Sequence, residues 1–162
     1  MFSVGERVVH PMHGAGVIDD IVEERIAGIR QEYYVFKMPV GGLILKIPTA
    51  NSAAIGLRGI ITPQEAVSLL DAIPTLETEN NANWNKRYQE NMQRLKSGDL
   101  YEVARVIKTL VKRDRQRGLS TGERKMLHNA RQILVSELVL STERERQDVE
   151  AQLDCAMAQT RR

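Results

Sequence analysis

The chain is poor in cysteine and in long apolar runs, and each shortage excludes a class of protein. It contains one cysteine, Cys155, so no disulfide can form within the chain. No apolar run approaches the roughly 18 residues of a membrane span, and residues 1–7 lack the basic and apolar regions of a signal peptide. These features favour a reducing, cytoplasmic compartment. Because Cys155 lies among Leu153, Ala156 and Met157, we interpret it as a small buried hydrophobe.

Histidine is also scarce, and the residue patterns of catalytic and metal sites are missing. The three histidines, His10, His13 and His128, have no cysteine or acid at metal-ligand spacing. We interpret His10 and His13 as packed turn residues. The glycine pairs in 14–16 and 41–42 do not open helices, so neither predicts a phosphate cradle. We therefore expect no enzyme activity, no cofactor and no metal.

Residues 1–60 have the pattern of a small β domain. Runs of strand-forming residues at 17–26, 33–38 and 43–47 are separated by turns rich in proline and glycine. Short strands with tight turns in so few residues predict a small, strongly bent barrel of the SH3 or Tudor type. The region holds six basic and six acidic residues, a balance that favours a protein partner over phosphate.

From Thr62 onward the apolar period becomes helical. Thr62-Pro63-Gln64-Glu65 is a helix N-terminus with proline at its first position. The sequence predicts five helices, and the fold class is α+β with two domains: the β-barrel in 1–60, then a compact five-helix bundle in 61–162. The helices are expected at 63–72, 84–95, 100–117, from the capping box Ser120 to Glu123 onward, and from Ser141 onward, with a loop at 76–83.

Positive charge is concentrated in the helical region. Between Trp84 and Val135 there are 13 Lys and Arg residues against 5 acids, a net charge of +8, whereas the whole chain carries only +2. A local positive field beside a large aromatic side chain is a common feature of nucleic-acid-binding proteins.

Trp84, the only tryptophan, allows two interpretations. Its spacing to Tyr88, Met92 and Leu95 predicts one apolar stripe, so Trp84 could begin the core face of its helix. Alternatively it is a wedge that enters a minor groove or stacks on a splayed base. Its place at the start of a helix, with Lys86 and Arg87 adjoining to reach phosphates, favours the second interpretation.

Basic residues also occur on one helix face, which has two interpretations, and at one position in a strand. One face of the helix at 100–117 carries Arg105, Lys108, Lys112 and Arg115, which form either a DNA-binding surface or an ordinary solvated face. Lys46, in an otherwise apolar strand, is the kind of residue that protects an edge strand from aggregation.

Several stretches of the sequence are distinctive in combination. They are the opening motif Val8-Val9-His10-Pro11-Met12-His13-Gly14-Ala15-Gly16 and the segments 43–48, 55–58, 83–88, 97–99, 113–120, 123–127 and 130–134. Together they resemble the CarD family (also called CdnL-type) of bacterial RNA polymerase-binding transcription regulators. The opening motif is shared with transcription-repair coupling factors, but the helical stretches and the lack of a helicase motif indicate the stand-alone regulator.

The resemblance implies a mechanism. The Tudor-like domain would dock on the polymerase β subunit, where Lys46 matches a basic contact. A second basic contact position falls near Glu24 here, and Arg25 beside it is the candidate substitute. The helical domain would contact promoter DNA at the upstream edge of the transcription bubble and stabilise the open complex. The resemblance implies Trp84 as the minor-groove wedge, with Arg87 and Arg124 as contacts to the DNA backbone. The neighbouring Lys86 and Lys125 complete the DNA-binding residues that we expect.

Two other functions fit the residue patterns. One is a protein–protein adaptor without DNA contact, and the other is an SH3-like RNA-binding module. We expect a cytoplasmic, nucleoid-associated bacterial protein that is monomeric, although a strand- or domain-swapped dimer stays open because a short β domain joined to a bundle can exchange strands.

Overall fold

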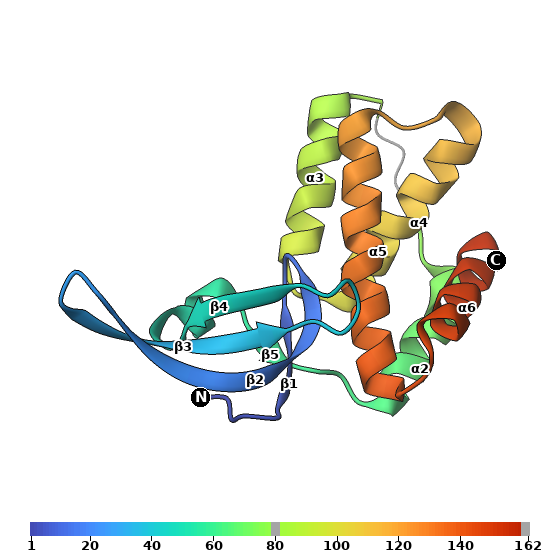
Figure 1. The fold of residues 1–162 in the computed structure, drawn as a ribbon. Coiled ribbons are helices and arrows are strands. Elements are labelled where there is room, and N and C mark those ends of the chain that lie inside the picture. The colour runs from blue at the N-terminus through green and yellow to red at the C-terminus, as the bar shows by residue number, and fades with distance from the viewer. Residues whose placement is uncertain (79–81, 160–162) are drawn as a thin grey trace.

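The computed structural model describes residues 1–78 and 82–159 and has the predicted α+β architecture in two parts (Figure 1). A five-stranded antiparallel sheet comes first, and the helices follow. Part of the loop predicted at 76–83, residues 79–81, lies outside the described residues. No helix in the described ranges is both long and apolar enough to cross a membrane.

The sheet has the strand order β4-β3-β2-β1-β5, so β4 and β5 are its edges. Its strands are β1 (Arg7–His10), β2 (Gly14–Ile26), β3 (Ile29–Lys37), β4 (Ile44–Pro48) and β5 (Arg58–Gly59). A register shift between Ile18 and Asp20 bends β2 across the sheet. Gly16 permits this packing, because a Cβ there would lie 2.4 Å from the carbonyl oxygen of Lys37 and 2.7 Å from the Phe36 ring.

Strands β2 and β3 form a long hairpin that extends away from the helices (Figure 1). The two residues at its turn, Ala27 and Gly28, both have positive φ angles, 54° and 78°, as expected for a tight turn that matches the twist of the strands. Ile26 and Ile29 flank this turn and are largely exposed.

The helical part contains five longer helices, as predicted. They are α2 (Pro63–Ala72), α3 (Trp84–Lys96), α4 (Leu100–Arg117), α5 (Thr121–Thr142) and α6 (Arg146–Ala158), preceded by the short α1 (Ser52–Ile55) and by the 3₁₀ turns η1 (Thr49–Asn51) and η2 (Ile73–Thr75). The bounds predicted for α2 and α4 are confirmed. The start predicted for the last helix at Ser141 is wrong: α5 continues to Thr142, Glu143 turns the chain with φ 55°, and α6 begins at Arg146.

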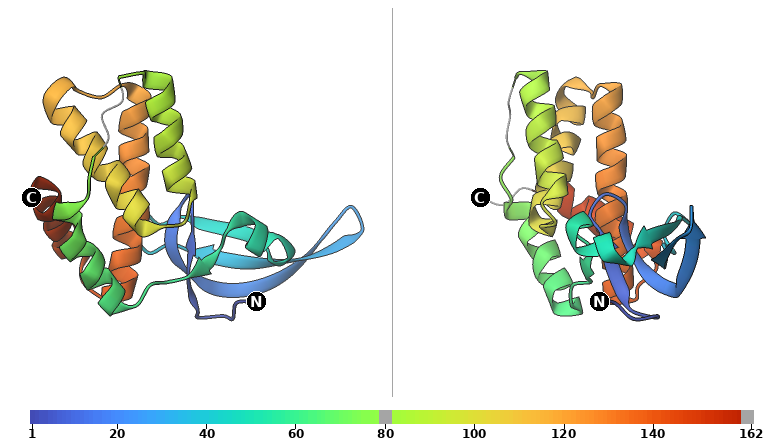
Figure 2. Two further views of the ribbon diagram at one scale, coloured as in Figure 1. Left: turned by 180° about the vertical axis from the view of Figure 1, so that it is seen from behind. Right: turned by 90° about the vertical axis from the view of Figure 1, so that its left-hand side faces the viewer.

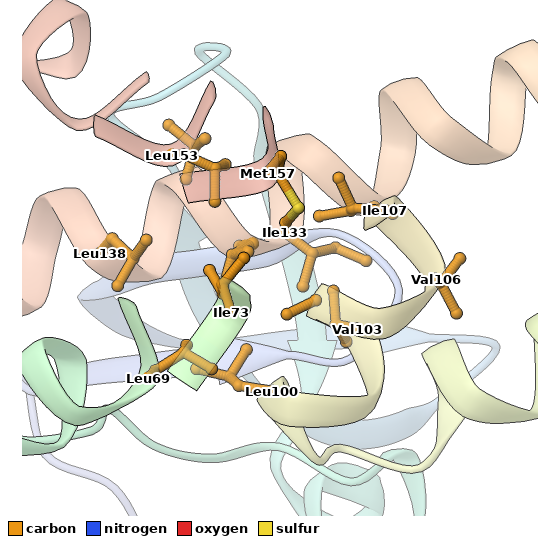
Figure 3. Close-up of a cluster of buried hydrophobic side chains, with 14 of the residues drawn as sticks. Leu69, Ile73, Leu100, Val103, Val106, Ile107, Ile133, Leu138, Leu153 and Met157 are labelled. Carbon is orange, nitrogen blue, oxygen red and sulfur yellow. The ribbon is translucent and has the colours of Figure 1, made fainter. Parts of the chain in front are cut away.

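The main hydrophobic core lies between α2, α4, α5 and α6 (Figure 3). Val149, Leu153 and Met157 of α6 face into it, as their spacing predicted. The interpretation of Cys155 as buried is wrong, because it lies on the outer face of α6 and is exposed. Its apolar neighbours in sequence point to the other side of the helix.

The two parts are joined through α5, which crosses the β1–β2 end of the sheet (Figures 1 and 2). The Ser136 hydroxyl accepts a hydrogen bond of 2.8 Å from the backbone N–H of Ala15, and a Cβ at Gly14 would lie 2.4 Å from that hydroxyl oxygen. Next to Ser136, the carboxylate of Glu137 is fully buried. It accepts two hydrogen bonds from Arg58 and one from the backbone N–H of Ile61.

Candidate nucleic-acid interface

The N-termini of α3 and α5 lie together at one end of the bundle. Trp84 is the first residue of α3, and Asn83 caps that helix by accepting from the N–H of Lys86. Ser120 caps α5 by accepting from the N–H of Glu123. The Trp84 ring contacts the first turn of α5, since its Nε1–H donates to the Ser120 hydroxyl at 3.1 Å. Both helices therefore direct the positive ends of their dipoles to the same place.

Trp84 is neither a core residue nor a free side chain. Its side chain is 43% exposed, and it stacks on Tyr88 with ring centroids 5.1 Å apart and an interplanar angle of 18°. A Cβ at Gly122 would lie 3.6–3.7 Å from these two rings, an ordinary contact distance, so both rings pack close to the first turn of α5. The indole is held on the bundle and still offers surface to a ligand.

The buried stripe of α3 differs from the predicted one. Arg87, Asn91 and Leu95 are buried, whereas Tyr88 and Met92 are only partly buried beside them. The helix is therefore rotated about its axis relative to the stripe predicted from Trp84, Tyr88, Met92 and Leu95. Polar side chains form most of this buried stripe. The side-chain oxygen of Asn91 accepts from Arg94 on the same helix, whereas Arg87 meets a partner across the helix interface, which helical periodicity cannot reveal.

That partner is Glu123, so the expected phosphate contact of Arg87 needs correction. The Arg87 side chain is buried, and its Nε and Nη2 donate to the Glu123 carboxylate at 2.9 and 3.2 Å. Burial raises the pKa of Glu123, but the bonds from Arg87 and Ser120 outweigh it and leave that pKa below its usual value. With its charge neutralised inside the bundle, Arg87 does not present its guanidinium to a DNA backbone in this structure.

The other three cations predicted near Trp84 are exposed. Lys86 lies in the first turn of α3, and Arg124 and Lys125 lie in the first two turns of α5. We call Trp84, Lys86, Arg124 and Lys125 the Trp84 face. It joins one aromatic surface, three exposed cations and two helix N-termini, a combination that attracts a polyanion.

The basic face predicted on α4 is largely used within the protein. Lys108 is buried, and its Nζ donates to the carbonyl oxygens of Ile73, Pro74 and Leu76 at 2.8, 3.0 and 2.8 Å. Arg105 donates to the carbonyl oxygen of Glu77. Burial, and next the charge of Lys112, lower the pKa of Lys108. Part of the net positive charge therefore anchors the segment after α2 and is not available to DNA.

On the sheet, Lys46 lies on the edge strand β4 and forms an ion pair with Glu24 of β2. Its side chain is 52% exposed. Glu24, which occupies the position expected for a second basic contact, thus pairs with Lys46, the other expected contact. Arg25, the candidate substitute, is exposed and lies opposite Arg30 near the end of the β2–β3 hairpin.

His10 and His13 pack against each other, with ring centroids 4.6 Å apart. Only His13 lies in the turn, because His10 is the last residue of β1. The Nδ1 atom of His10 accepts a hydrogen bond from the N–H of Met12. Burial, and next the charge of His13, lower the pKa of His10 to about 4. Within 1–78 and 82–159, no group of three or more His, Cys, Asp or Glu side chains is placed to hold a metal ion.

Sequence reasoning missed Ser120 and Glu123 as neighbours of Trp84. Their spacing predicted a capping box. In the structure the Ser120 hydroxyl accepts from the N–H of Glu123, and the Glu123 carboxylate accepts from that hydroxyl. Nothing in the local pattern indicated that the same serine would accept from an indole 36 residues earlier in the chain.

Comparisons with known proteins agree with this two-part description. Residues 2–61 match the family model described as "CarD-like/TRCF RID domain", and residues 68–154 match "CarD, C-terminal domain". The chain is 32% identical over 138 residues to the putative transcription factor YdeB of Bacillus subtilis (strain 168), with 85% of this chain and 90% of that protein covered.

Proposed function

Because the chain belongs to the CarD family of transcription regulators, we propose that it binds the β subunit of RNA polymerase through its sheet and stabilises the open promoter complex through the Trp84 face. In this proposal the indole of Trp84 enters the minor groove at the upstream edge of the bubble. Lys86, Arg124 and Lys125 contact phosphates and fix the register, since such contacts position a protein without specifying sequence.

The geometry of Trp84 carries the DNA part of the proposal. Unstacking a base step in duplex DNA costs on the order of a few kcal/mol, but at the bubble edge the neighbouring pairs are already open. A wedge there therefore binds the open promoter better than the closed one. Only this difference in affinity shifts the equilibrium between the two. An indole that is 43% exposed at the end of a helix is accessible to such a junction.

The docking of the sheet on α5 supports the joint action of the two surfaces. Hydrogen bonds from Arg58, Ile61 and Ala15 fix the sheet against the bundle. A polymerase contact on the sheet then holds the Trp84 face in one place and raises its effective concentration at the promoter. Weak binding of the free protein to DNA is compatible with this arrangement.

Replacing Trp84 with alanine should shorten the lifetime of the open complex about tenfold, because stacking of an aromatic side chain on a base contributes roughly 1–3 kcal/mol. The measurement is the dissociation rate of open complexes formed by RNA polymerase on a linear promoter, with competitor DNA added. Tyr101→Ala is the matched control, since Tyr101 is a similarly exposed aromatic residue, 40% against 43%. It lies in the first turn of α4, beyond the C-terminus of α3.

Equal lifetimes with wild type and a folded Trp84→Ala protein, both bound to polymerase, would contradict the wedge and favour an adaptor without DNA contact. A loss of folding in the variant, seen by circular dichroism, would instead assign Trp84 to packing.

Replacing Lys46 with glutamate should weaken binding to RNA polymerase about tenfold. The substitution removes a cation from the edge strand, and the new carboxylate repels Glu24 beside it. Lys37→Glu is the matched control, because Lys37 lies on the same sheet, is 48% exposed and pairs with Asp19. Binding is measured by titration with core polymerase. An unchanged affinity of the Lys46→Glu protein would remove Lys46 from the interface.

A further inference from the structure

The indole N–H of Trp84 is the outer end of a continuous chain of hydrogen bonds that leads into the bundle. It donates to the Ser120 hydroxyl, which donates to Oε1 of Glu123 at 3.2 Å. The Glu123 carboxylate in turn accepts from Arg87. These hydrogen bonds link α3 to α5 through pairs of residues that are 36 positions apart in the sequence.

The bonding capacity of the Ser120 hydroxyl fixes its orientation. A hydroxyl has one proton to donate and two lone pairs to accept with. Here the proton goes to the Glu123 carboxylate, which can only accept while it is charged. The lone pairs receive the N–H of Glu123 at 3.2 Å and the indole N–H of Trp84 at 3.1 Å. The charged carboxylate therefore keeps the hydroxyl in the state that accepts from the indole.

Arg87 fixes the carboxylate in its turn. Its Nε donates to one carboxylate oxygen at 2.9 Å and its Nη2 to the other at 3.2 Å. The side chains of Arg87 and Glu123 are only 6% and 2% exposed. A forked, buried pair of this kind has little freedom to rotate. It also keeps Glu123 ionised, in accord with its lowered pKa.

We propose that Ser120, Glu123 and Arg87 are positioning residues that hold the Trp84 indole, stacked on Tyr88, in the orientation in which it enters DNA. This proposal rests on the proposed function. In this proposal Arg87 helps to position Trp84 and does not itself contact a phosphate. A side chain that is already ordered loses less conformational entropy on binding, so the affinity for open DNA is higher.

The test compares two helix caps of the same kind. Ser120→Ala removes a cap and the indole acceptor together. Thr62→Ala removes only a cap, because Thr62 accepts from the N–H of Glu65 and bonds to the Glu65 carboxylate in the same way at the start of α2. The probe is acrylamide quenching of Trp84, the only tryptophan. We expect the quenching constant to rise about twofold in Ser120→Ala and to stay at the wild-type value in Thr62→Ala and in Ser120→Thr, which keeps the hydroxyl.

The second measurement is affinity for a DNA duplex with a pre-melted bubble. Loss of one hydrogen bond of typical strength, about 1 kcal/mol, corresponds to a weakening of about fivefold in Ser120→Ala. In a Trp84→Ala background the same replacement should have no further effect. If Ser120→Ala does not fold, Ser120→Gly removes the hydroxyl while keeping a residue that caps helices almost as well.

A quenching constant that is equal in wild type and in the folded Ser120 variants would overturn the positioning role. An equal loss of DNA affinity in Thr62→Ala and Ser120→Ala would overturn it as well, because the loss would then be that of a cap alone. Failure of the proposed function gives another pattern: Trp84→Ala would leave the open-complex lifetime unchanged while Ser120→Ala still increased quenching.

Discussion

Replacing Arg58 with alanine should lower the free energy of unfolding by about 3 kcal/mol, because it would leave a buried carboxylate without its counter-ion. Glu137 of α5 is fully buried, and both of its carboxylate oxygens accept from Arg58 of β5, at 2.8 and 2.9 Å. The Arg58 side chain is itself 30% exposed, so water can reach part of the space left by alanine. For that reason we place the effect at the lower end of the range for broken buried pairs.

Urea unfolding monitored by circular dichroism measures this change. Arg30→Ala is the control, since Arg30 pairs with Glu23 on the surface of the same sheet with both side chains more than half exposed. It should change stability by less than about 1 kcal/mol. The double variant Arg58→Ala with Glu137→Gln should recover most of the loss, because glutamine keeps an acceptor for the N–H of Ile61 and leaves no buried charge. A single-variant loss no larger than that of Arg30→Ala would show that the ion pair does not stabilise the docking.

A functional consequence follows from the same contact. If the sheet and the bundle separate more easily, polymerase no longer holds the Trp84 face in a fixed place. We therefore expect Arg58→Ala to reduce open-complex lifetime at a temperature where the protein is still folded, although Arg58 lies outside the Trp84 face and on the opposite edge strand of the sheet from Lys46. The double variant restores the lifetime if docking is the cause.

Replacing Lys108 with methionine should lower the free energy of unfolding by about 3 kcal/mol. Methionine keeps the unbranched apolar stem but removes three hydrogen bonds to carbonyl oxygens. Bonds from a charged donor contribute about 1.5–3 kcal/mol each, and unpaired buried acceptors add a penalty. The three bonds share one ammonium group, and burying that charge in the wild-type protein costs desolvation free energy. The contributions of the three bonds therefore do not simply add.

Lys112→Met is the matched control for Lys108→Met. Lys112 lies one turn further along α4, is exposed, and forms a long hydrogen bond of 3.4 Å to the Thr78 hydroxyl. Its replacement should change stability by no more than about 0.5 kcal/mol. Thermal unfolding of the two variants gives the comparison. Equal midpoints would mean that water satisfies the carbonyl oxygens of η2 when Lys108 is absent.

The sequence predicted best those features that depend on neighbours in the chain. The bounds of α2 and α4 follow from Thr62, Asp99 and Gly118, which cap or end helices through backbone groups within four residues of themselves. The sheet was predicted because runs of strand-forming residues and proline or glycine turns also act over short distances in the chain. The start of α6 was missed because Ser141 resembles a cap. In the structure its hydroxyl donates to the carbonyl oxygen of Ile61, in the segment between β5 and α2.

The sequence by itself determined the α+β class, most helix bounds and the excess of positive charge behind Trp84. Only the tertiary structure decided what each charge does. Arg87 pairs with Glu123, Lys108 binds the carbonyl oxygens after α2, and Lys46 pairs with Glu24, while Lys86 and Arg124 are exposed. The physical reason is that a long basic side chain has the same local pattern whether it bonds inside or faces water. Its partner comes from a distant part of the chain, brought near only when the helices and the sheet pack together.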